Sequence, residues 1–282
     1  MLSDHYTRVP DLADAILSAY GDADIGIDDL APADEFHLGG ATATAALAAD
    51  LGLSADDHLL DIGCGIGGPA RRLASLTGCR VTGVDLTPSF VDAATVLSAR
   101  VGLAGRTAFV VGNANQLAPD PAVTAAMLMH VGMNVADKHA LFAGVAGLLP
   151  AGGRFAIYDI MRVGEGVFDL PQPFASAAEH VHVETPDAYV AALEAAGFAV
   201  TEPEDRTQMA LDAPAVGSEQ GPPRAVVQFV SRVGAAAAGD EQGTAALSLA
   251  TVMGPNFLTM FENLRAALRS GILAPVQIIA TR

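Results

Sequence analysis

The stretch Leu59-Leu60-Asp61-Ile62-Gly63-Cys64-Gly65-Ile66-Gly67-Gly68-Pro69-Ala70-Arg71 decides the fold. A short apolar run leads into a glycine cluster and then into an amphipathic segment, which is the order strand, tight turn, helix. Gly63, Gly65 and Gly67 permit positive φ and let a ligand approach main-chain N–H groups without a Cβ in the way. The following helix would offer its positive dipole end to an anionic ligand group. The stretch therefore predicts a nucleotide-type ligand loop.

Two cofactor patterns fit these letters. Gly63-x-Gly65-x-x-Gly68 satisfies the dinucleotide fingerprint of NAD and FAD proteins, and Asp85 lies where that pattern expects a ribose-binding acid. The same letters place Asp61 just before the first glycine, where its carboxylate would repel a pyrophosphate. S-adenosylmethionine carries a cationic amino group and a sulfonium, which suit a carboxylate. The stretch resembles motif I of the class I S-adenosylmethionine-dependent methyltransferases.

The rest of the chain alternates between strand and helix patterns. We expect strands at residues 58–62, 80–85, 107–111, 122–129, 154–160, 198–202 and 275–281. We expect helices at residues 11–19, 41–51, 69–77, 88–101, 138–149, 185–197 and 257–270, with an irregular acidic stretch over 20–34. This order predicts an α/β fold, a Rossmann-like seven-stranded, mostly parallel sheet with helices on both faces and an inserted helical cap.

The same patterns divide the chain into four segments. Residues 1–56 form an N-terminal helical lid segment, and residues 57–205 form the S-adenosylmethionine-binding core. Residues 206–256 form a cap, whose Met209, Met253 and Phe229 are candidates for pocket walls. Residues 257–282 supply the final helix and strand of the core.

Further features resemble the same family. Asp85 ends the second strand, where the family's acid holds the ribose hydroxyls, and Asn113-Ala114 follows the third, near the expected adenine. The segments His130-Val131-Gly132-Met133-Asn134, Ala156-Ile157-Tyr158-Asp159 and Phe36-His37-x-Gly39-Gly40 are similar to small-molecule methyltransferases of the glycine/sarcosine and phosphoethanolamine kind. The resemblance implies S-adenosyl-L-methionine as cofactor and S-adenosyl-L-homocysteine as product. The cofactor-binding residues it implies are Asp61, Gly63, Cys64, Gly65, Gly67, Asp85, Leu86, Asn113, Ala114, Gly39 and Met129.

Methyl transfer from a sulfonium needs chiefly collinear positioning and exclusion of water, and a base only where the acceptor must lose a proton. His130 follows the fourth strand at the carboxyl end of the sheet, so it is the candidate base or substrate hydrogen-bonding group. The candidate substrate-binding residues are His37, Met133, Asn134, Asp159 and His180. Asp159 is preferred to Tyr158 because it lies nearer the strand tip. His180-x-His182 lacks a third ligand at recognisable spacing, so no metal site is expected.

Composition excludes several partners. The chain has 282 residues, is 51% hydrophobic, carries a formal net charge of −17 and contains a single lysine, Lys138. A nucleic-acid substrate needs a basic face, so we expect none and expect a small-molecule substrate instead. No apolar run approaches the ~20 residues of a membrane span. We expect a soluble, cytoplasmic protein without a membrane partner. A homodimer is compatible with the sequence, which does not reveal the oligomeric state.

These observations predict S-adenosylmethionine-dependent methyl transfer to a small molecule. Nitrogen is the favoured acceptor atom because of the glycine-type resemblance, and oxygen and carbon stay open. The alternative is an NAD(P)- or FAD-dependent oxidoreductase that uses the glycine loop, although this leaves Asp61 unexplained. A third hypothesis is a cofactor-binding protein without catalysis.

Overall fold

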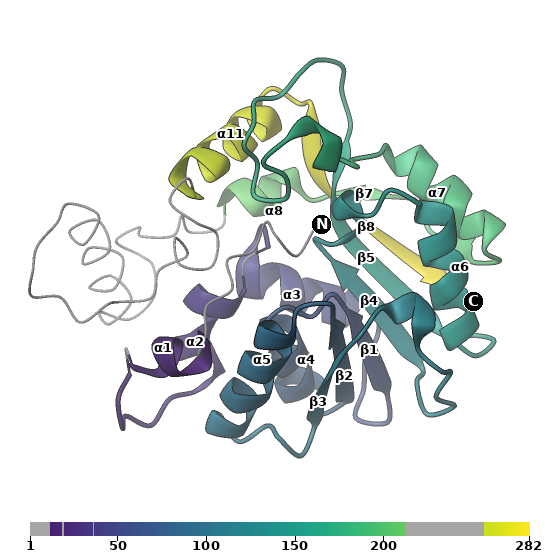
Figure 1. Ribbon diagram of the computed structural model, residues 1–282. Helices are drawn as coiled ribbons and strands as arrows, with labels where there is room; N and C mark the ends of the chain where they lie inside the picture. Colours follow the sequence, from purple (N-terminus) through teal and green to yellow (C-terminus); the bar gives the residue numbers. More distant parts are fainter. Residues whose placement is uncertain (1–11, 19, 36, 213–256) are drawn as a thin grey trace, which may run out of the picture.

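The computed structural model describes residues 12–18, 20–35, 37–212 and 257–282. At its centre lies an eight-stranded sheet of order β3-β2-β1-β4-β5-β8-β6, with β7 also paired to β8 (Figure 1). The strands are β1 (His58–Ile62), β2 (Arg80–Asp85), β3 (Thr107–Val111), β4 (Ala125–Met129), β5 (Arg154–Arg162), β6 (Ala199–Val200), β7 (Glu204–Asp205) and β8 (Leu273–Thr281).

Strands β3, β2, β1, β4 and β5 run parallel, and β8 lies antiparallel against β5. Every residue of β4 is buried, as is all of β5 except its two ends, because helices cover both faces of this part of the sheet. β4 begins at Ala125 rather than at residue 122, since Asp120 accepts from the Ala122 N–H and holds a turn there. The parallel order brings the carboxyl ends of β1, β2, β4 and β5 to one edge of the sheet.

The sheet has eight strands rather than the expected seven because its last edge strand is interrupted. β6 pairs with the Ala280 end of β8, and β7 pairs with the same strand at Gln277 and Val276. Pro203 lies between the two segments and has no N–H to donate to a ladder. β6 and β7 therefore occupy one position along β8, and the predicted Rossmann-like α/β class is confirmed with this difference in strand count.

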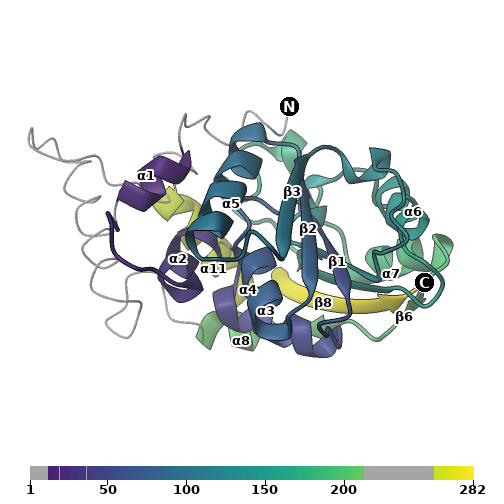
Figure 2. The ribbon, with the colours of Figure 1, turned by 90° about the horizontal axis from the view of Figure 1, so that it is seen from below.

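Helices cover the sheet on both sides (Figure 2). α3 (Gly40–Asp50) and α4 (Gly68–Thr77) pack against one face, and α5 (Pro88–Arg100) contacts β2 and β3. α6 (Lys138–Leu148) and α7 (Pro186–Ala195) pack against the other face. These bounds agree closely with the expected helices. Side chains cap the starts of α6 and α7, where Asp137 accepts from the Ala140 N–H and Thr185 accepts from the Ala188 N–H.

The acidic stretch expected to be irregular contains a helix, α2 (Ile27–Asp34), so that prediction was wrong. The Asp29 side chain accepts from the Gly26 N–H and completes the first turn, and acidic residues favour this end of a helix. α1 (Leu12–Ser18) was expected, and it packs with α5 in an apolar cluster that also contains Leu30 of α2. The described helices α1 and α2 therefore form an N-terminal layer that packs against α5 and α4.

The predicted cap is described only at its ends. α8 (Thr207–Asp212) begins it, α11 (Phe257–Arg269) follows it, and residues 213–256, with Phe229 and Met253, lie outside the described residues. Phe36 of the expected lid also lies outside them. Within the described part of the chain, no helix combines the length and the apolar character needed to cross a membrane.

Candidate functional site

The glycine loop connects β1 to α4 in a backbone conformation that requires glycine. Gly63, Gly65 and Gly67 have φ of 74°, 52° and 81°, and Gly67 is the N-cap of α4. A Cβ on Gly63 would lie 2.4 Å from a Val131 methyl carbon, so this position is closed to larger residues by packing as well. The predicted strand, turn and helix are confirmed.

Four main-chain N–H groups of the glycine loop already have acceptors within the protein. The N–H groups of Gly63 and Cys64 both donate to the Val84 carbonyl, and the Gly67 N–H donates to the Cys64 carbonyl. The Gly65 N–H donates to the Asp85 carboxylate at 2.9 Å. The main-chain N–H groups of these four residues are therefore already paired inside the protein. What the loop offers a ligand is a surface with few side chains, which the ligand can approach closely.

Two carboxyl groups lie beside this surface. Asp61 is only 2% exposed, and its Oδ2 has no hydrogen-bond partner among the described residues. Burial, together with the nearby Asp85 carboxylate, raises the pKa of Asp61 to about 8. Asp85 accepts from the N–H groups of Gly65 and Thr87, each at 2.9 Å, and keeps further lone pairs for a ligand. A buried acceptor without a partner indicates a position where a ligand donor or cation belongs.

The other predicted cofactor-binding residues differ in their exposure and in the face of the sheet on which they lie. Leu86, directly after Asp85, is 61% exposed and presents an apolar surface at the tip of β2. Asn113 is exposed, and its amide oxygen accepts from the Asn115 N–H, so it caps a turn. Ala114 is buried in the core on the α6 face, and Met129 is buried on the opposite face, which it shares with Tyr158. The surroundings of the glycine loop are therefore polar at Asp61 and apolar at Leu86.

His130 follows β4 at the same edge of the sheet. It has φ of 54°, the one positive value among the described non-glycine residues, which marks a constrained backbone. Its ring stacks on the Tyr158 ring with centroids 5.3 Å apart, and its Nε2 is buried without a partner among the described residues. Burial lowers the pKa of His130 well below its ordinary value, with a smaller contribution from His37. The ring is therefore neutral at physiological pH and can accept or donate one hydrogen bond.

Residues 37–40, which we call the lid loop, lie against His130 and Tyr158. The His37 ring is 6.0 Å from the His130 ring and 6.2 Å from the Tyr158 ring, between centroids. The Tyr158 hydroxyl donates to the Leu38 carbonyl at 3.0 Å, and a Cβ on Gly39 would lie 3.6 Å from that hydroxyl oxygen. Burial lowers the pKa of His37 to about 4, so this ring is neutral as well.

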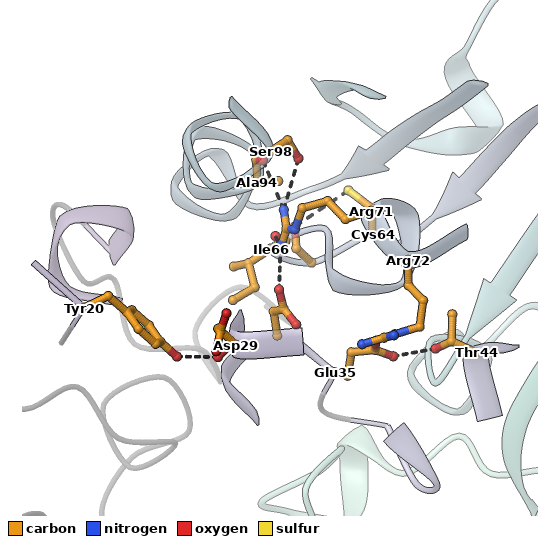
Figure 3. Close-up of polar contacts among 12 residues, drawn as sticks. Tyr20, Asp29, Glu35, Thr44, Cys64, Ile66, Arg71, Arg72, Ala94 and Ser98 are labelled. Atoms are coloured by element: carbon orange, nitrogen blue, oxygen red, sulfur yellow. Dashed lines mark hydrogen bonds and ion pairs between the residues drawn. The ribbon is translucent and has the colours of Figure 1, made fainter. Parts of the chain in front are cut away.

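Polar contacts hold the lid loop in place. His37 Nε2 lies 2.9 Å from the Gly40 carbonyl and 3.1 Å from Thr44 Oγ1, whose proton goes to Glu35 at 2.6 Å. Because a carbonyl only accepts, Nε2 carries the proton of the His37 ring and Nδ1 has the free lone pair. Arg72 of α4 donates from Nε to the other Glu35 oxygen (Figure 3).

A second arginine connects the N-terminal layer to the glycine loop. Arg71 is 1% exposed and pairs with Asp34 of α2 at 2.6 Å. It also donates to the carbonyls of Ile66 and Ala94 and to Ser98 (Figure 3). A Cβ on Gly68 would lie 2.2 Å from the Asp34 carbonyl oxygen, so α2 touches the first residue of α4 directly.

The remaining predicted substrate residues do not all reach this site. Met133 is buried in an apolar cluster with Phe174 and Leu264, and Asn134 is buried with an Oδ1 that has no hydrogen-bond partner in the part of the chain that the structure describes. His180 is exposed in a short 3-10 turn, Ala178–His180. Within the described part of the chain, no group of three or more His, Cys, Asp or Glu side chains could hold a metal ion.

Asp159 was expected to face the substrate in preference to Tyr158, but the structure places Tyr158, and not Asp159, on the face of β5 that lies toward His130. Residues 155 and 157 of β5 pack with α6 and α7, so Asp159 also points to that side, where it accepts from the Tyr189 hydroxyl at 2.7 Å. Tyr158 points to the opposite face, toward His130 and the lid loop. Nearness to the strand tip did not reveal which face of β5 lies toward His130 and the lid loop.

Sequence reasoning did not select Glu35, Thr44, Arg71 or Arg72. One signal was present, because Arg71-Arg72 is a basic pair on an amphipathic helix and acidic residues crowd the stretch over 20–34. In the structure these charges meet, with Asp28, Asp34 and Glu35 all paired to the two arginines.

Comparisons with known proteins agree with this geometry. Residues 60–157 match the family described as Methyltransferase domain. The chain is 32% identical over 129 residues to the sterol 24-C-methyltransferase of Neurospora crassa, covering 45% of this chain and 34% of that protein. It is 30% identical over 171 residues to the 27-O-demethylrifamycin SV methyltransferase of Amycolatopsis mediterranei, covering 57% of this chain and 61% of that protein. The chain thus spans about a third of the length of the sterol methyltransferases it matches.

Solved structures share the fold. Phosphoethanolamine N-methyltransferase 2 of Haemonchus contortus superposes with a TM-score of 0.70 at 17% identity, over 100% of this chain and 60% of that one. A geranyl diphosphate methyltransferase solved in complex with SAM gives a TM-score of 0.61 at 20% identity, over 86% of this chain and 85% of that one.

Proposed function

We propose that this chain, which carries a methyltransferase domain over residues 60–157, transfers a methyl group from S-adenosylmethionine to a small-molecule acceptor. One observation carries the proposal. The buried Asp61 carboxyl beside the glycine loop has an oxygen with no partner among the described residues, so it suits a cationic amino group.

The other residues of the loop fit the same cofactor. Asp85 at the tip of β2 has lone pairs left for two ribose hydroxyls, and the exposed Leu86 beside it offers an apolar surface for an adenine. Asn113 is a weaker candidate for binding the adenine amino group, because its side-chain oxygen already accepts the hydrogen bond that caps a turn. The bound cofactor would supply the electrophilic methyl group.

The dinucleotide alternative is disfavoured on the same contacts. A pyrophosphate needs free main-chain donors, and those of Gly63, Cys64, Gly65 and Gly67 are already used. It would also lie near two carboxyl groups. The glycine spacing alone permits that cofactor, but the local charges oppose it.

His130 is the proposed acceptor-side residue. Its ring is neutral and buried, and its Nε2 has no partner among the described residues, so it can take a proton from the acceptor or hold the acceptor by one hydrogen bond. Tyr158 supports the ring from one side, and His37 of the lid loop lies beside both. The lid loop would keep water from the reacting atoms, which favours methyl transfer over hydrolysis.

The acceptor atom follows from two different arguments. Nitrogen is the first candidate because of the resemblance to glycine- and phosphoethanolamine-type enzymes. A hydroxyl oxygen is the second candidate, and the observation in its favour is the neutral His130 ring, since a hydroxyl must lose its proton to become a good nucleophile. Amines and phenols are therefore the two acceptor classes to screen.

Calorimetric titration tests the cofactor first. We expect S-adenosylhomocysteine to bind the wild-type chain, Asp61→Asn to abolish binding, and Asp85→Ala to weaken it by about 1–3 kcal/mol. Asp137→Asn, which alters a helix cap away from the loop, is the matched control and should bind normally. Binding of NADH without binding of S-adenosylhomocysteine would replace this proposal with the oxidoreductase.

A turnover assay tests the acceptor. Incubation with methyl-labelled S-adenosylmethionine and a panel of amines and phenols should transfer label to one class. His130→Gln should reduce turnover without changing affinity for S-adenosylhomocysteine. Transfer that is unaffected by His130→Gln would remove His130 from the chemistry.

A further inference from the structure

A buried polar cluster lies next to the chain segment that follows His130. It is on the face of the sheet opposite Tyr158. It consists of Asp159 on β5, Tyr189 on α7 and Lys138 on α6. Asp159 and Tyr189 are each 0% exposed and Lys138 is 5% exposed. Ionisable groups this deeply buried are retained in proteins only with partners, so the contacts they make are informative.

The Asp159 carboxyl group accepts hydrogen bonds from two donors and lies against the turn that follows His130. The Tyr189 hydroxyl donates to Oδ2 at 2.7 Å, and the Ile160 N–H donates to Oδ1 at 3.0 Å. Burial raises the pKa of Asp159 to about 7, while these two donors, Lys138 and the neighbouring Met133 N–H act to lower it. Met133 is the middle residue of the 3-10 turn Gly132–Asn134, so the carboxylate holds this turn by its main chain.

Lys138 holds the far end of the same turn. Its Nζ donates to the Val135 carbonyl at 2.5 Å and to the His182 carbonyl at 2.8 Å, and it lies 5.3 Å from the centre of the Tyr189 ring. The Val135 N–H closes the turn on the Gly132 carbonyl at 2.8 Å. The turn after His130 is thus held from one side by a carboxylate and from the other by an ammonium group.

The packing at Gly132 shows how closely this turn approaches the cluster. A Cβ at that position would lie 2.3 Å from Asp159 Oδ2 and 2.7 Å from the Tyr189 hydroxyl oxygen. His130 lies just before this turn and has the positive φ of 54°. Such a conformation costs free energy in a non-glycine residue, so contacts elsewhere must maintain it.

We propose that Asp159 is a positioning residue, whose carboxylate fixes the turn Gly132–Asn134 and thereby holds His130 in the left-handed conformation that stacks its ring on Tyr158. The inference rests on the proposed function only in assuming that His130 contacts the methyl acceptor. It replaces the substrate contact expected of Asp159, which points away from the lid loop.

The test needs no known acceptor. Nuclear magnetic resonance of the imidazole nitrogens reports the protonation of His130, which is assigned by its loss in His130→Gln. Amide hydrogen exchange reports the Met133 N–H. In the wild-type chain we expect His130 to stay neutral at pH 6 and the Met133 amide to exchange slowly.

In Asp159→Asn one acceptor oxygen becomes a donor that faces the Tyr189 hydroxyl or the Met133 N–H. We expect the His130 signals to shift and the Met133 amide to exchange at least about tenfold faster, as a lost charged hydrogen bond predicts. Tyr189→Phe removes one contact and should give a smaller change of the same kind. Asp137→Asn, a carboxylate that caps α6 through the Ala140 N–H at 2.8 Å, is the matched control and should change neither signal.

Unchanged His130 signals in a folded Asp159→Asn or Tyr189→Phe protein would overturn the inference. Tyr189→Phe decides the question if Asp159→Asn does not fold. S-adenosylhomocysteine affinity should stay within about twofold of wild type in both variants. Failure of the wild-type chain to bind that ligand, with the His130 changes intact, would count against the proposed function alone.

Discussion

His130, directly after β4, and Tyr158, in the middle of the neighbouring parallel strand β5, stack with ring centroids 5.3 Å apart. The His130 N–H also donates to the Tyr158 carbonyl at 2.8 Å. Tyr158 in turn donates its hydroxyl proton to Leu38, so one tyrosine contacts both the sheet edge and the lid loop. The position of the lid loop therefore depends on a side chain of the core.

Replacing Tyr158 by Phe should loosen the lid loop while preserving the ring stacking. The Leu38 carbonyl would lose its partner, which costs about 1 kcal/mol at a partly buried site. Urea denaturation should show this loss, and hydrogen exchange should accelerate in residues 37–40. Tyr158→Ala, which also removes the stacked ring, should cost more. Equal exchange in Tyr158→Phe and wild type would contradict the role of this hydrogen bond.

Asp61→Asn should make the chain more stable at alkaline pH. The pKa of Asp61 is about 8 in the folded chain and near 4 in the unfolded chain, so the folded state binds the extra proton between these values. The stability of the wild type should therefore fall as pH rises from about 4 through 8, and asparagine removes this fall. Thermal unfolding at pH 5, 7 and 9 measures it. Wild type and variant should be similar at pH 5 and furthest apart at pH 9.

Binding of the cofactor product should release a proton below pH 8. A cationic amino group beside Asp61 favours the ionised carboxylate, so Asp61 must lose its proton as S-adenosylhomocysteine binds. Affinity should rise about tenfold per pH unit between pH 6 and 8 and then level off, as linkage to one proton requires. Calorimetry in buffers of different ionisation enthalpy measures the released proton. A pH-independent affinity would place the amino group elsewhere.

Arg71→Met, which removes the ion pair between α4 and α2, should strongly destabilise the chain. It leaves the buried Asp34 carboxylate unpaired, and breaking a buried ion pair in this way costs about 3–5 kcal/mol. The double variant Arg71→Met, Asp34→Asn should recover part of that loss. Arg206→Met is the control, because its partners Asp50 and Glu204 have side chains that are 41% and 58% exposed, and it should cost about 1 kcal/mol or less. Chemical denaturation compares the four proteins, and an Arg71→Met cost no larger than that of Arg206→Met would contradict the buried-pair argument.

The sequence by itself determined the succession of strand, glycine turn and helix around Gly63. Apolar runs bounded by glycine and proline are local signals, and positive φ demands glycine, so β1, β2 and β3 begin and end at the predicted residues. The methyltransferase resemblance is confirmed by the family match over residues 60–157. The parallel order also placed His130 at the carboxyl edge, because that edge follows from the direction of β4.

Only the tertiary structure decided which side chains face one another. The choice between Tyr158 and Asp159 depended on which helices cover each face of β5, and alternation along a strand does not carry that information. The pairing of Arg71 with Asp34 and of Arg72 with Glu35 joins residues far apart in the chain. Burial then changes their chemistry, since the pKa of Asp61 rises and those of His37 and His130 fall only where the folded chain excludes water.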